Sequence, residues 1–222
     1  MRYHYDAISN GVTPEMAIEI LKSGNERFIN NIRINRDLLQ LVNATAAEQS
    51  PFACILSCSD SRVPAELIFD QGLGDIFSIR LAGNIASVNA IGSIEYACKV
   101  LRSKLVVVMG HTNCGAIKGA CMGLDLGNLN ELLKHIHPAI AANGKAYLEY
   151  CDDKEYLDSL ALTNVRYQIT VILDKSEIIR SLIDQNEVAL MGAIYNVETG
   201  KVNFYDDYLN LLKNENLAAI EG

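Results

Sequence analysis

The sequence contains no tryptophan, only 4 prolines and no strongly basic stretch among its 222 residues. Lysine and arginine number 19 against 27 aspartates and glutamates, which gives a net charge of −8. An acidic chain without a clustered basic segment is poorly suited to bind a phosphate backbone, so we expect no nucleic-acid partner. Half of the residues are hydrophobic and 21% are charged, which provides material for a core and excludes a disordered or fibrous chain.

Long hydrophobic runs are also missing. The longest ones, such as residues 105–109, are far shorter than the roughly 18 residues that a membrane span needs. The first residues, Met1 to Gly11, have neither the apolar segment nor the small-residue cleavage site of a secretory signal. We therefore predict no membrane partner and a cytoplasmic location. In that reducing setting the six cysteines indicate metal ligands, catalytic groups or packing thiols in preference to a disulfide framework.

The apolar pattern predicts one domain, in which a helical arm (residues 1–48) precedes an α/β body (residues 49–222). In the arm, Thr13 stands before a proline, and this pair predicts the start of a helix that continues through Phe28 at helical spacing. The segment 32–49 has a polar middle, and we expect it to wrap over the body.

Short apolar runs bounded by Gly, Asp and Ser fill the body, a pattern typical of strands buried on both faces of a parallel sheet. We predict strands at 52–56, 76–79, 105–109 and 188–197, and a hairpin partner of the last strand at 201–205. Helical patterns alternate with these strands at 64–69, 87–101, 116–122, 129–143 and 154–184. The sequence therefore predicts an α/β fold, with a central, mainly parallel sheet flanked by helices and an antiparallel hairpin at one edge.

Metal-ligand residues follow two of these strands, at the carboxyl ends where the chemistry of α/β folds lies. Cys58 comes shortly after the first strand, and His111 and Cys114 follow the third. Two thiolates and an imidazole suit Zn²⁺, and three protein ligands leave a fourth position open, as in catalytic sites. Asp60 could close the site, although Arg62 would compete for it as an ion-pair partner. Each motif is a weak signal alone, and their combination indicates zinc.

Cys54 lies inside a predicted strand and Cys98 within a predicted helix, while Cys121 and Cys151 lack a histidine or cysteine at ligand spacing. We interpret these four remaining cysteines as packing thiols. His135 and His137 are two apart on a predicted helix, so their side chains point to different faces. We expect both histidines to be solvated, while a role in proton relay stays open.

Four segments together resemble the β-class carbonic anhydrases: Cys58-Ser-Asp-Ser-Arg62, Arg80-Leu-Ala-Gly-Asn84, Gly92-Ser-Ile-Glu-Tyr96 and Gly110-His-Thr-Asn-Cys-Gly-Ala116. The resemblance implies an α/β fold, a homodimer often paired into a tetramer, and reversible hydration of CO₂ to bicarbonate and a proton by a zinc-bound hydroxide. The alternatives are a family relative that hydrolyses COS or CS₂, and a non-catalytic, zinc-stabilised interaction domain. The intact motif around Asp60 favours CO₂.

The resemblance also assigns roles to residues of the site. Cys58, His111 and Cys114 would ligate one zinc ion per chain, and Asp60 and Arg62 would form a catalytic pair.

Further residues match the active-site surroundings of the family. Gln49 falls where its plant-like members keep an active-site glutamine. The CO₂ pocket, formed partly by the neighbouring subunit, would include Phe77, Ala82, Tyr96 and Gly115. Two departures leave the shape of the pocket open, because Leu81 replaces a common asparagine and Ala82 replaces a common valine.

Some members of the family bind bicarbonate at a second site, which stabilises a closed, inactive state with the aspartate on zinc. That site uses a tryptophan, an arginine and a tyrosine, and the corresponding residues here are Ile55, Arg80 and Tyr195. Because this chain has no tryptophan and keeps Gln49, we predict an open site near neutral pH. Asp60 would then pair with its arginine neighbour, and would ligate the metal only in a closed state.

Overall fold

The computed structural model describes residues 11–143 and 150–205. Its five-stranded sheet has the order β2-β1-β3-β4-β5, in which β5 is antiparallel to β4 and the other neighbours are parallel. The strands are β1 (Ala53–Ser57), β2 (Ile76–Arg80), β3 (Leu105–His111), β4 (Ala189–Tyr195) and β5 (Val202–Tyr205). The predicted α/β fold, with a mainly parallel sheet and an antiparallel edge hairpin, is confirmed.

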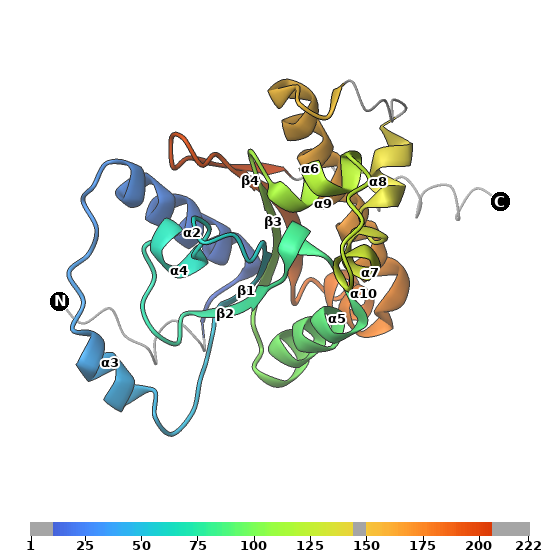
Figure 1. Ribbon diagram of the computed structural model, residues 1–222. Helices are drawn as coiled ribbons and strands as arrows, with labels where there is room; N and C mark the ends of the chain where they lie inside the picture. The colour runs from blue at the N-terminus through green and yellow to red at the C-terminus, as the bar shows by residue number, and fades with distance from the viewer. Residues whose placement is uncertain (1–10, 144–149, 206–222) are drawn as a thin grey trace.

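Helices cover both faces of the sheet, with α2 and α4 on one side and α6, α8, α9 and α10 on the other (Figure 1). Helical turns of other types include a 3₁₀ turn at Ala82–Asn84 and a π-helical turn at Tyr96–Val100. The α-helices are α2 (Pro14–Ile29), α3 (Leu38–Ala44), α4 (Ala65–Ile68), α5 (Val88–Glu95), α6 (Gly115–Cys121), α7 (Leu129–Leu133), α8 (His137–Ala142), α9 (Lys154–Lys175) and α10 (Glu177–Asp184).

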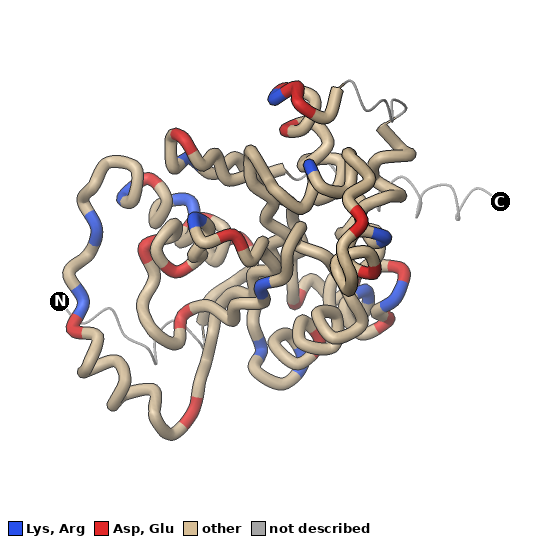
Figure 2. Tube along the Cα trace, in the orientation of Figure 1, with Lys and Arg blue, Asp and Glu red and all other residues tan. Residues whose placement is uncertain are grey.

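The centre of the core is formed by β1 and β3, in which every residue is buried. Strands that are apolar on both faces need a layer of helices on each side, which the two helical layers provide. α9 lies closely against β3. A Cβ added at Gly110 of β3 would come within 2.8 Å of Cγ2 of Val165 on α9. In Figure 2 the tube through β1 and β3 carries no charged residue, and charges of both signs are scattered around the outside.

The predicted start of the first helix is confirmed. Oγ1 of Thr13 accepts a hydrogen bond from the amide of Met16 at 3.3 Å, and a proline occupies the first turn. Among the described helices, none combines the length and the hydropathy that a membrane crossing requires. Residues 1–10, on which the expectation about a secretory signal depends, lie outside the described residues.

The prediction that segment 32–49 wraps over the body is wrong. The segment contains α3, in which no residue is buried, and Figure 1 shows this helix standing away from the sheet. Leu38 and Leu39 are 58% and 71% exposed. The near face of the sheet is covered instead by α2, which precedes this segment, and by α4 (Figure 1).

Two of the predicted helices are each divided into two. Segment 129–143 forms α7 and α8, and Pro138 stands in the first turn of α8, where a proline fits but cannot continue an earlier helix. Segment 154–184 forms α9 and α10, which meet at Ser176. The Oγ of Ser176 accepts a hydrogen bond from the amide of Ile179 at 3.1 Å and so begins the second helix.

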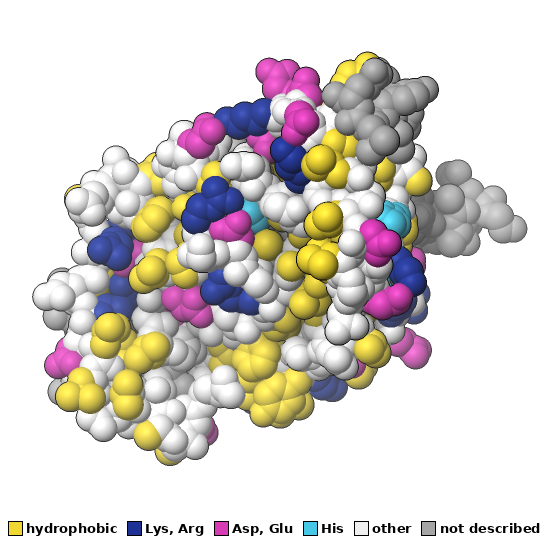
Figure 3. Space-filling model, in the orientation of Figure 1, with side chains coloured by type: hydrophobic (Ala, Val, Ile, Leu, Met, Phe, Trp, Pro, Cys, Tyr) yellow, Lys and Arg dark blue, Asp and Glu magenta, His cyan; other side chains and the backbone are white. Residues whose placement is uncertain are grey.

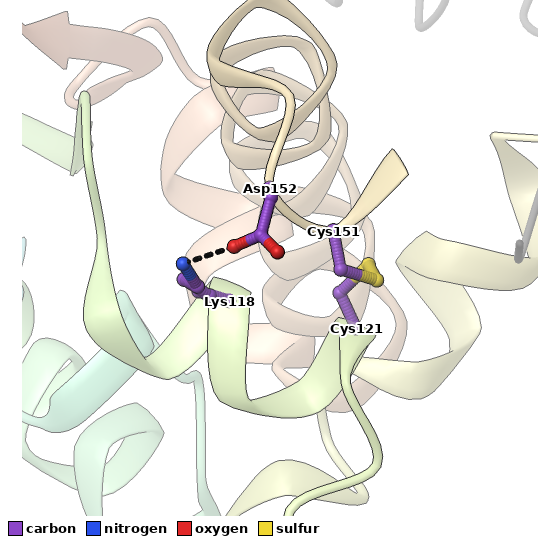
Figure 4. Close-up of a disulfide and its surroundings, with 4 residues drawn as sticks. All are labelled: Lys118, Cys121, Cys151 and Asp152. Atoms are coloured by element: carbon purple, nitrogen blue, oxygen red, sulfur yellow. Dashed lines mark hydrogen bonds and ion pairs between the residues drawn. A yellow bond between two sulfur atoms is a disulfide. The ribbon is translucent and has the colours of Figure 1, made fainter. Parts of the chain in front are cut away.

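The interpretation of Cys121 and Cys151 as packing thiols is wrong, because they form a disulfide (Figure 4). The bond joins the end of α6 to a residue that lies two positions before Asp153, the N-cap of α9. Their Cα atoms are 5.7 Å apart although 30 residues separate them in the sequence, so helix packing brings them together. Cys54 and Cys98 are buried as predicted, and burial raises the pKa of both thiols.

Candidate metal and catalytic site

Two neighbouring strands, β1 and β3, bring the metal-ligand residues to one edge of the sheet. Ser57, the last residue of β1, pairs in register with Met109 of β3. Cys58 therefore leaves β1 close to the point where His111 ends β3 and Cys114 precedes α6. One ligand atom from each of these three buried side chains lies within 4.8 Å of the other two. The structure thus brings together the group that the sequence predicts.

The imidazole of His111 shows whether this group suits a metal ion. Its Nδ1 lies 2.9 Å from the carbonyl oxygen of Thr112, which can only accept, so Nδ1 carries the proton. Nε2 then has a free lone pair, and it is buried without a hydrogen-bond partner among the described residues. Because a buried polar atom left unpaired costs free energy, Nε2 beside two sulfurs fits a borderline-soft ion such as Zn²⁺.

Hydrogen-bond donors surround the two cysteine sulfurs. The backbone amides of Asp60 and Gly83 each lie 3.4 Å from Sγ of Cys58. A hydrogen bond from the Cys114 thiol, supported by these amides, lowers the pKa of Cys58 to about 4 in spite of its burial. Sharing a proton with Cys58 raises the pKa of Cys114, and the first amides of α6 oppose that rise. The pair therefore gives up its first proton readily, as a metal site requires.

Asp60 and Arg62 form the pair that the sequence predicts. Nε of Arg62 donates to Oδ1 of Asp60 at 2.9 Å and Nη2 donates to Oδ2 at 2.8 Å, while the Arg62 amide adds a third bond of 2.9 Å to Oδ1. The Arg62 side chain thereby holds the pKa of Asp60 well below its usual range. Oδ2 of Asp60 lies 4.0 Å from Nε2 of His111. The carboxylate of Asp60 is therefore ionised and held in one orientation beside the three metal-ligand side chains.

Arg80, at the carboxyl end of β2, holds the backbone that carries both groups. Its Nε donates to the carbonyl oxygen of Cys58 at 3.2 Å, and its Nη2 donates to that of Asp60 at 2.6 Å. From the sequence we assigned Arg80 only to a second, regulatory site. Arg80 directly follows a predicted strand, and this position in the sequence was the signal for its contact with the active-site backbone.

The turn between His111 and Cys114 depends on Asn113, which has a φ of 55°. Asparagine adopts this left-handed conformation more easily than most residues. The amide of Asn113 donates to Oδ1 of Asp158 on α9 at 3.1 Å, and its carbonyl accepts from Nη2 of Arg62 at 3.3 Å. Sequence reasoning missed Asp158, which lies 45 residues beyond the turn.

The predicted pocket residues differ in their surroundings. The rings of Phe77 and Tyr96 pack together with centroids 6.1 Å apart. Gly115 begins α6, and a Cβ there would meet no atom within 4 Å, so the space beside it is open. Ala82 lies in the 3₁₀ turn after β2. Gln49 is exposed before β1, and its side chain has no hydrogen bond to the other described residues.

Comparison with known proteins identifies one family. Its sequence profile, described as carbonic anhydrase, matches residues 53–202. Carbonic anhydrase 2 of Mycobacterium tuberculosis is 33% identical over 204 residues, which cover 89% of this chain and 96% of that protein.

Solved structures give the class within the family. The β-carbonic anhydrase CafA of Aspergillus fumigatus superposes with a TM-score of 0.69 at 29% identity, over 76% of this chain and 81% of its own. One of two tetrameric β-carbonic anhydrases from Sordaria macrospora has a TM-score of 0.69 at 25% identity, over 86% and 95% of the two chains. With its profile match, its fold and a Cys-His-Cys group at the ends of β1 and β3, this chain belongs to the β-class carbonic anhydrases.

Proposed function

We propose that Cys58, His111 and Cys114 hold one zinc ion per chain, with which the chain catalyses the reversible hydration of CO₂ to bicarbonate and a proton. The reaction is that of the family to which the chain belongs. The observation that carries the ligand assignment is the buried Nε2 of His111, which has no hydrogen-bond partner among the described residues, on a side chain that offers a nitrogen within 4.8 Å of both sulfurs. Three protein ligands leave a coordination position for the reaction.

A bound zinc ion supplies the Lewis acidity that makes water a nucleophile near neutral pH. The residues of the chain orient the reaction. Asp60 remains ionised because Arg62 lowers its pKa, so it can accept a hydrogen bond from the attacking water and direct a lone pair toward the CO₂ carbon. Arg62 and Arg80 hold the side chain and the carbonyl of Asp60 in that position.

The pocket residues complete the proposal. Phe77 and Tyr96 offer apolar ring surface to an apolar substrate. Ala82 has only a methyl side chain and Gly115 has none, and the space beside Gly115 is open. Gln49 would donate a hydrogen bond to the oxygen that gains negative charge. Because its side chain is exposed in a single chain, we propose that it does so at a face between subunits.

A homodimer is part of the same proposal. Figure 3 shows hydrophobic side chains gathered over α3 and near the end of α5. Leu39 is 71% exposed on α3, and Val88 and Val100 are 79% and 59% exposed around α5. Exposed apolar patches mark interaction surfaces, and the tetrameric relative from Sordaria macrospora supports pairing of dimers as a further step.

Metal analysis and stopped-flow CO₂ hydration test the proposal. We expect one zinc ion per chain, loss of activity with a chelator and recovery when zinc returns. Cys58→Ser and His111→Ala should lose zinc, while Cys98→Ala, a buried cysteine outside the group, should keep it. Full retention of zinc in both ligand variants would overturn the assignment.

The same preparations separate the alternatives. Hydrolysis of COS or CS₂ without hydration of CO₂ would identify a relative with a different substrate. Zinc binding without turnover of any of these compounds would identify a zinc-stabilised interaction domain.

A further inference from the structure

Gly83 connects the segment after β2 to the metal ligand Cys58. Its amide is one of the two that donate to Sγ of Cys58. Gly83 has a φ of 70°, and the next residue, Asn84, is also left-handed with a φ of 45°. Glycine adopts a positive φ as readily as a negative one, so the backbone preference of Gly83 does not by itself fix this turn. The contacts of this turn therefore decide whether the Gly83 amide stays on the sulfur.

Two amide side chains of α9 bind the backbone at and just after this turn. Nδ2 of Asn164 donates to the carbonyl oxygen of Gly83 at 2.9 Å, and Oε1 of Gln168 accepts from the amide of Ala86 at 2.9 Å. Asn164 and Gln168 stand one helical turn apart, and Nε2 of Gln168 donates to Oδ1 of Asn164 at 3.0 Å. Both residues are buried. Because each amide donates and accepts at fixed atoms, the pair fits the turn in one orientation.

The packing around this pair leaves little freedom for movement. Val165, the neighbour of Asn164, lies against Gly110 of β3, where a Cβ would come within 2.8 Å of its Cγ2. On the turn itself, a Cβ at Gly83 would come within 2.8 Å of Cδ1 of Ile136. The sheet, α9 and the turn are therefore fixed relative to one another, and Asn164 is the link between α9 and Gly83.

We infer that Asn164 is a positioning residue of the metal site, which holds Gly83 so that its amide remains on Sγ of Cys58. An amide hydrogen bond spreads the negative charge of a thiolate and fixes the direction in which its lone pairs point. Groups that orient a metal ligand in this way commonly change metal affinity by about 10- to 100-fold. The inference rests on the proposed zinc site and extends it to a residue of α9 that does not touch the ligand.

The test compares zinc affinity, measured by competition with a coloured chelator, in Asn164→Asp and in the unmodified chain. Aspartate keeps the size of the side chain but presents an oxygen to the Gly83 carbonyl, so the hydrogen bond is lost. Ile169→Val, a buried position of the same helix, is the matched control for a change in packing. We expect zinc affinity to fall about 10-fold or more in Asn164→Asp and to stay unchanged in Ile169→Val.

A second readout separates positioning from a purely structural role. Co²⁺ in place of zinc gives a thiolate-to-metal absorption band that reports the environment of the sulfurs. The band should shift in Asn164→Asp and not in Ile169→Val. A variant with lower unfolding stability but unchanged zinc affinity and an unchanged cobalt band would overturn the inference. If the aspartate variant does not fold, Asn164→Ser removes the same hydrogen bond without adding charge, and the same outcomes decide.

Zinc binding by the unmodified chain is measured first, so that two failures can be told apart. If the unmodified chain and Cys58→Ser bind zinc equally, or neither binds it, the proposed function fails. If zinc binds through Cys58 and the Asn164 variants bind it as tightly, only the role of Asn164 is overturned.

Discussion

Arg62 binds Asp60 through two parallel hydrogen bonds, one of 2.9 Å from Nε to Oδ1 and one of 2.8 Å from Nη2 to Oδ2. The Arg62 side chain is 46% exposed and that of Asp60 is 19% exposed. Exposed ion pairs contribute little to the stability of the fold, but a bidentate contact with a planar guanidinium fixes the orientation of the carboxylate. The pair therefore serves to orient the carboxylate beside the ligand group more than to stabilise the fold.

The first prediction concerns the removal of this contact. Arg62→Ala should keep zinc and lose about 100-fold in CO₂ hydration, because the carboxylate is no longer held in a productive position. Arg62→Lys should retain an intermediate activity, since lysine keeps the charge but not the two-pronged geometry. Stopped-flow rates per bound zinc measure both.

Arg180→Ala is the matched control, because Arg180 is an exposed arginine on α10, away from the ligand loops. It should leave the rate unchanged. Near-normal turnover in zinc-replete Arg62→Ala would remove the pair from the mechanism.

The second prediction concerns bicarbonate. Ile55, at the position of the tryptophan in the family's second site, is fully buried in β1. Arg80 already donates to the carbonyl oxygens of Cys58 and Asp60, so its guanidinium is hydrogen-bonded to the backbone of the active-site loop. We expect activity to rise with pH as steeply as the titration of one proton allows. Bicarbonate should leave the steepness of this pH dependence unchanged. A steep, cooperative curve that bicarbonate shifts would contradict this expectation.

The metal group and the sheet were predictable because they depend on local patterns. Cys58 follows a short continuous apolar run of the kind typical of a buried strand, and His111 and Cys114 are three residues apart after another such run. The contacts that support the site were not predictable. Asn164 lies 81 residues from Gly83, and periodicity shows which face of a helix is buried without showing which loop it meets.

Other differences between the sequence predictions and the structure had weak signals in the sequence, or none. Ser176 followed by Glu177 is a typical helix start, and it would have divided the long helix predicted over 154–184. The exposed position of α3 had no such signal, because apolar residues such as Leu39 indicate burial whether a partner lies in the same chain or in another. The spacing of Cys121 and Cys151 is likewise compatible with packing or pairing.

The third prediction concerns Asp70, which fastens the arm to the body. Its carboxylate accepts from Nε of Arg27 at 2.5 Å and from Nη1 of Arg36 at 2.7 Å, and its side chain is 3% exposed. Asp70→Asn keeps the shape of the side chain and tolerates the φ of 46°, but removes the carboxylate that pairs with both arginines. We expect a loss of about 2 to 3 kcal/mol in unfolding free energy, because the arginines keep some contact with water.

The pH dependence of this loss is a sharper test. Burial alone would raise the pKa of Asp70, but the hydrogen bonds from Arg27 and Arg36 outweigh it, so the pKa is lowered. A carboxylate of lowered pKa stabilises the fold above its unfolded pKa of about 3.9, and this stabilisation is lost as the pH falls through the folded pKa. Urea unfolding of both proteins should show a constant difference above about pH 5 that shrinks toward pH 3. A difference that grows on acidification would contradict the assignment.

The last prediction concerns the disulfide between Cys121 and Cys151, which closes a loop between α6 and α9. Reduction by a dithiol, which is itself oxidised to its disulfide while two thiols form in the protein, should lower the unfolding free energy by about 2–4 kcal/mol. Cys121→Ser with Cys151→Ser should be less stable by the same amount and insensitive to the dithiol. Urea unfolding with and without the reductant measures both effects.

A control near the disulfide separates the covalent bond from its surroundings. Lys118 and Asp152 form an exposed ion pair next to the disulfide, with Nζ and Oδ1 2.5 Å apart (Figure 4). Lys118→Ala should therefore change the unfolding free energy by less than about 1 kcal/mol and keep the response to the dithiol. Equal stability of the oxidised and reduced chains would show that the native fold holds α6 and α9 together without the bond. The protein would then lose little stability in a reducing compartment. In that case the predicted cytoplasmic location and this disulfide are compatible.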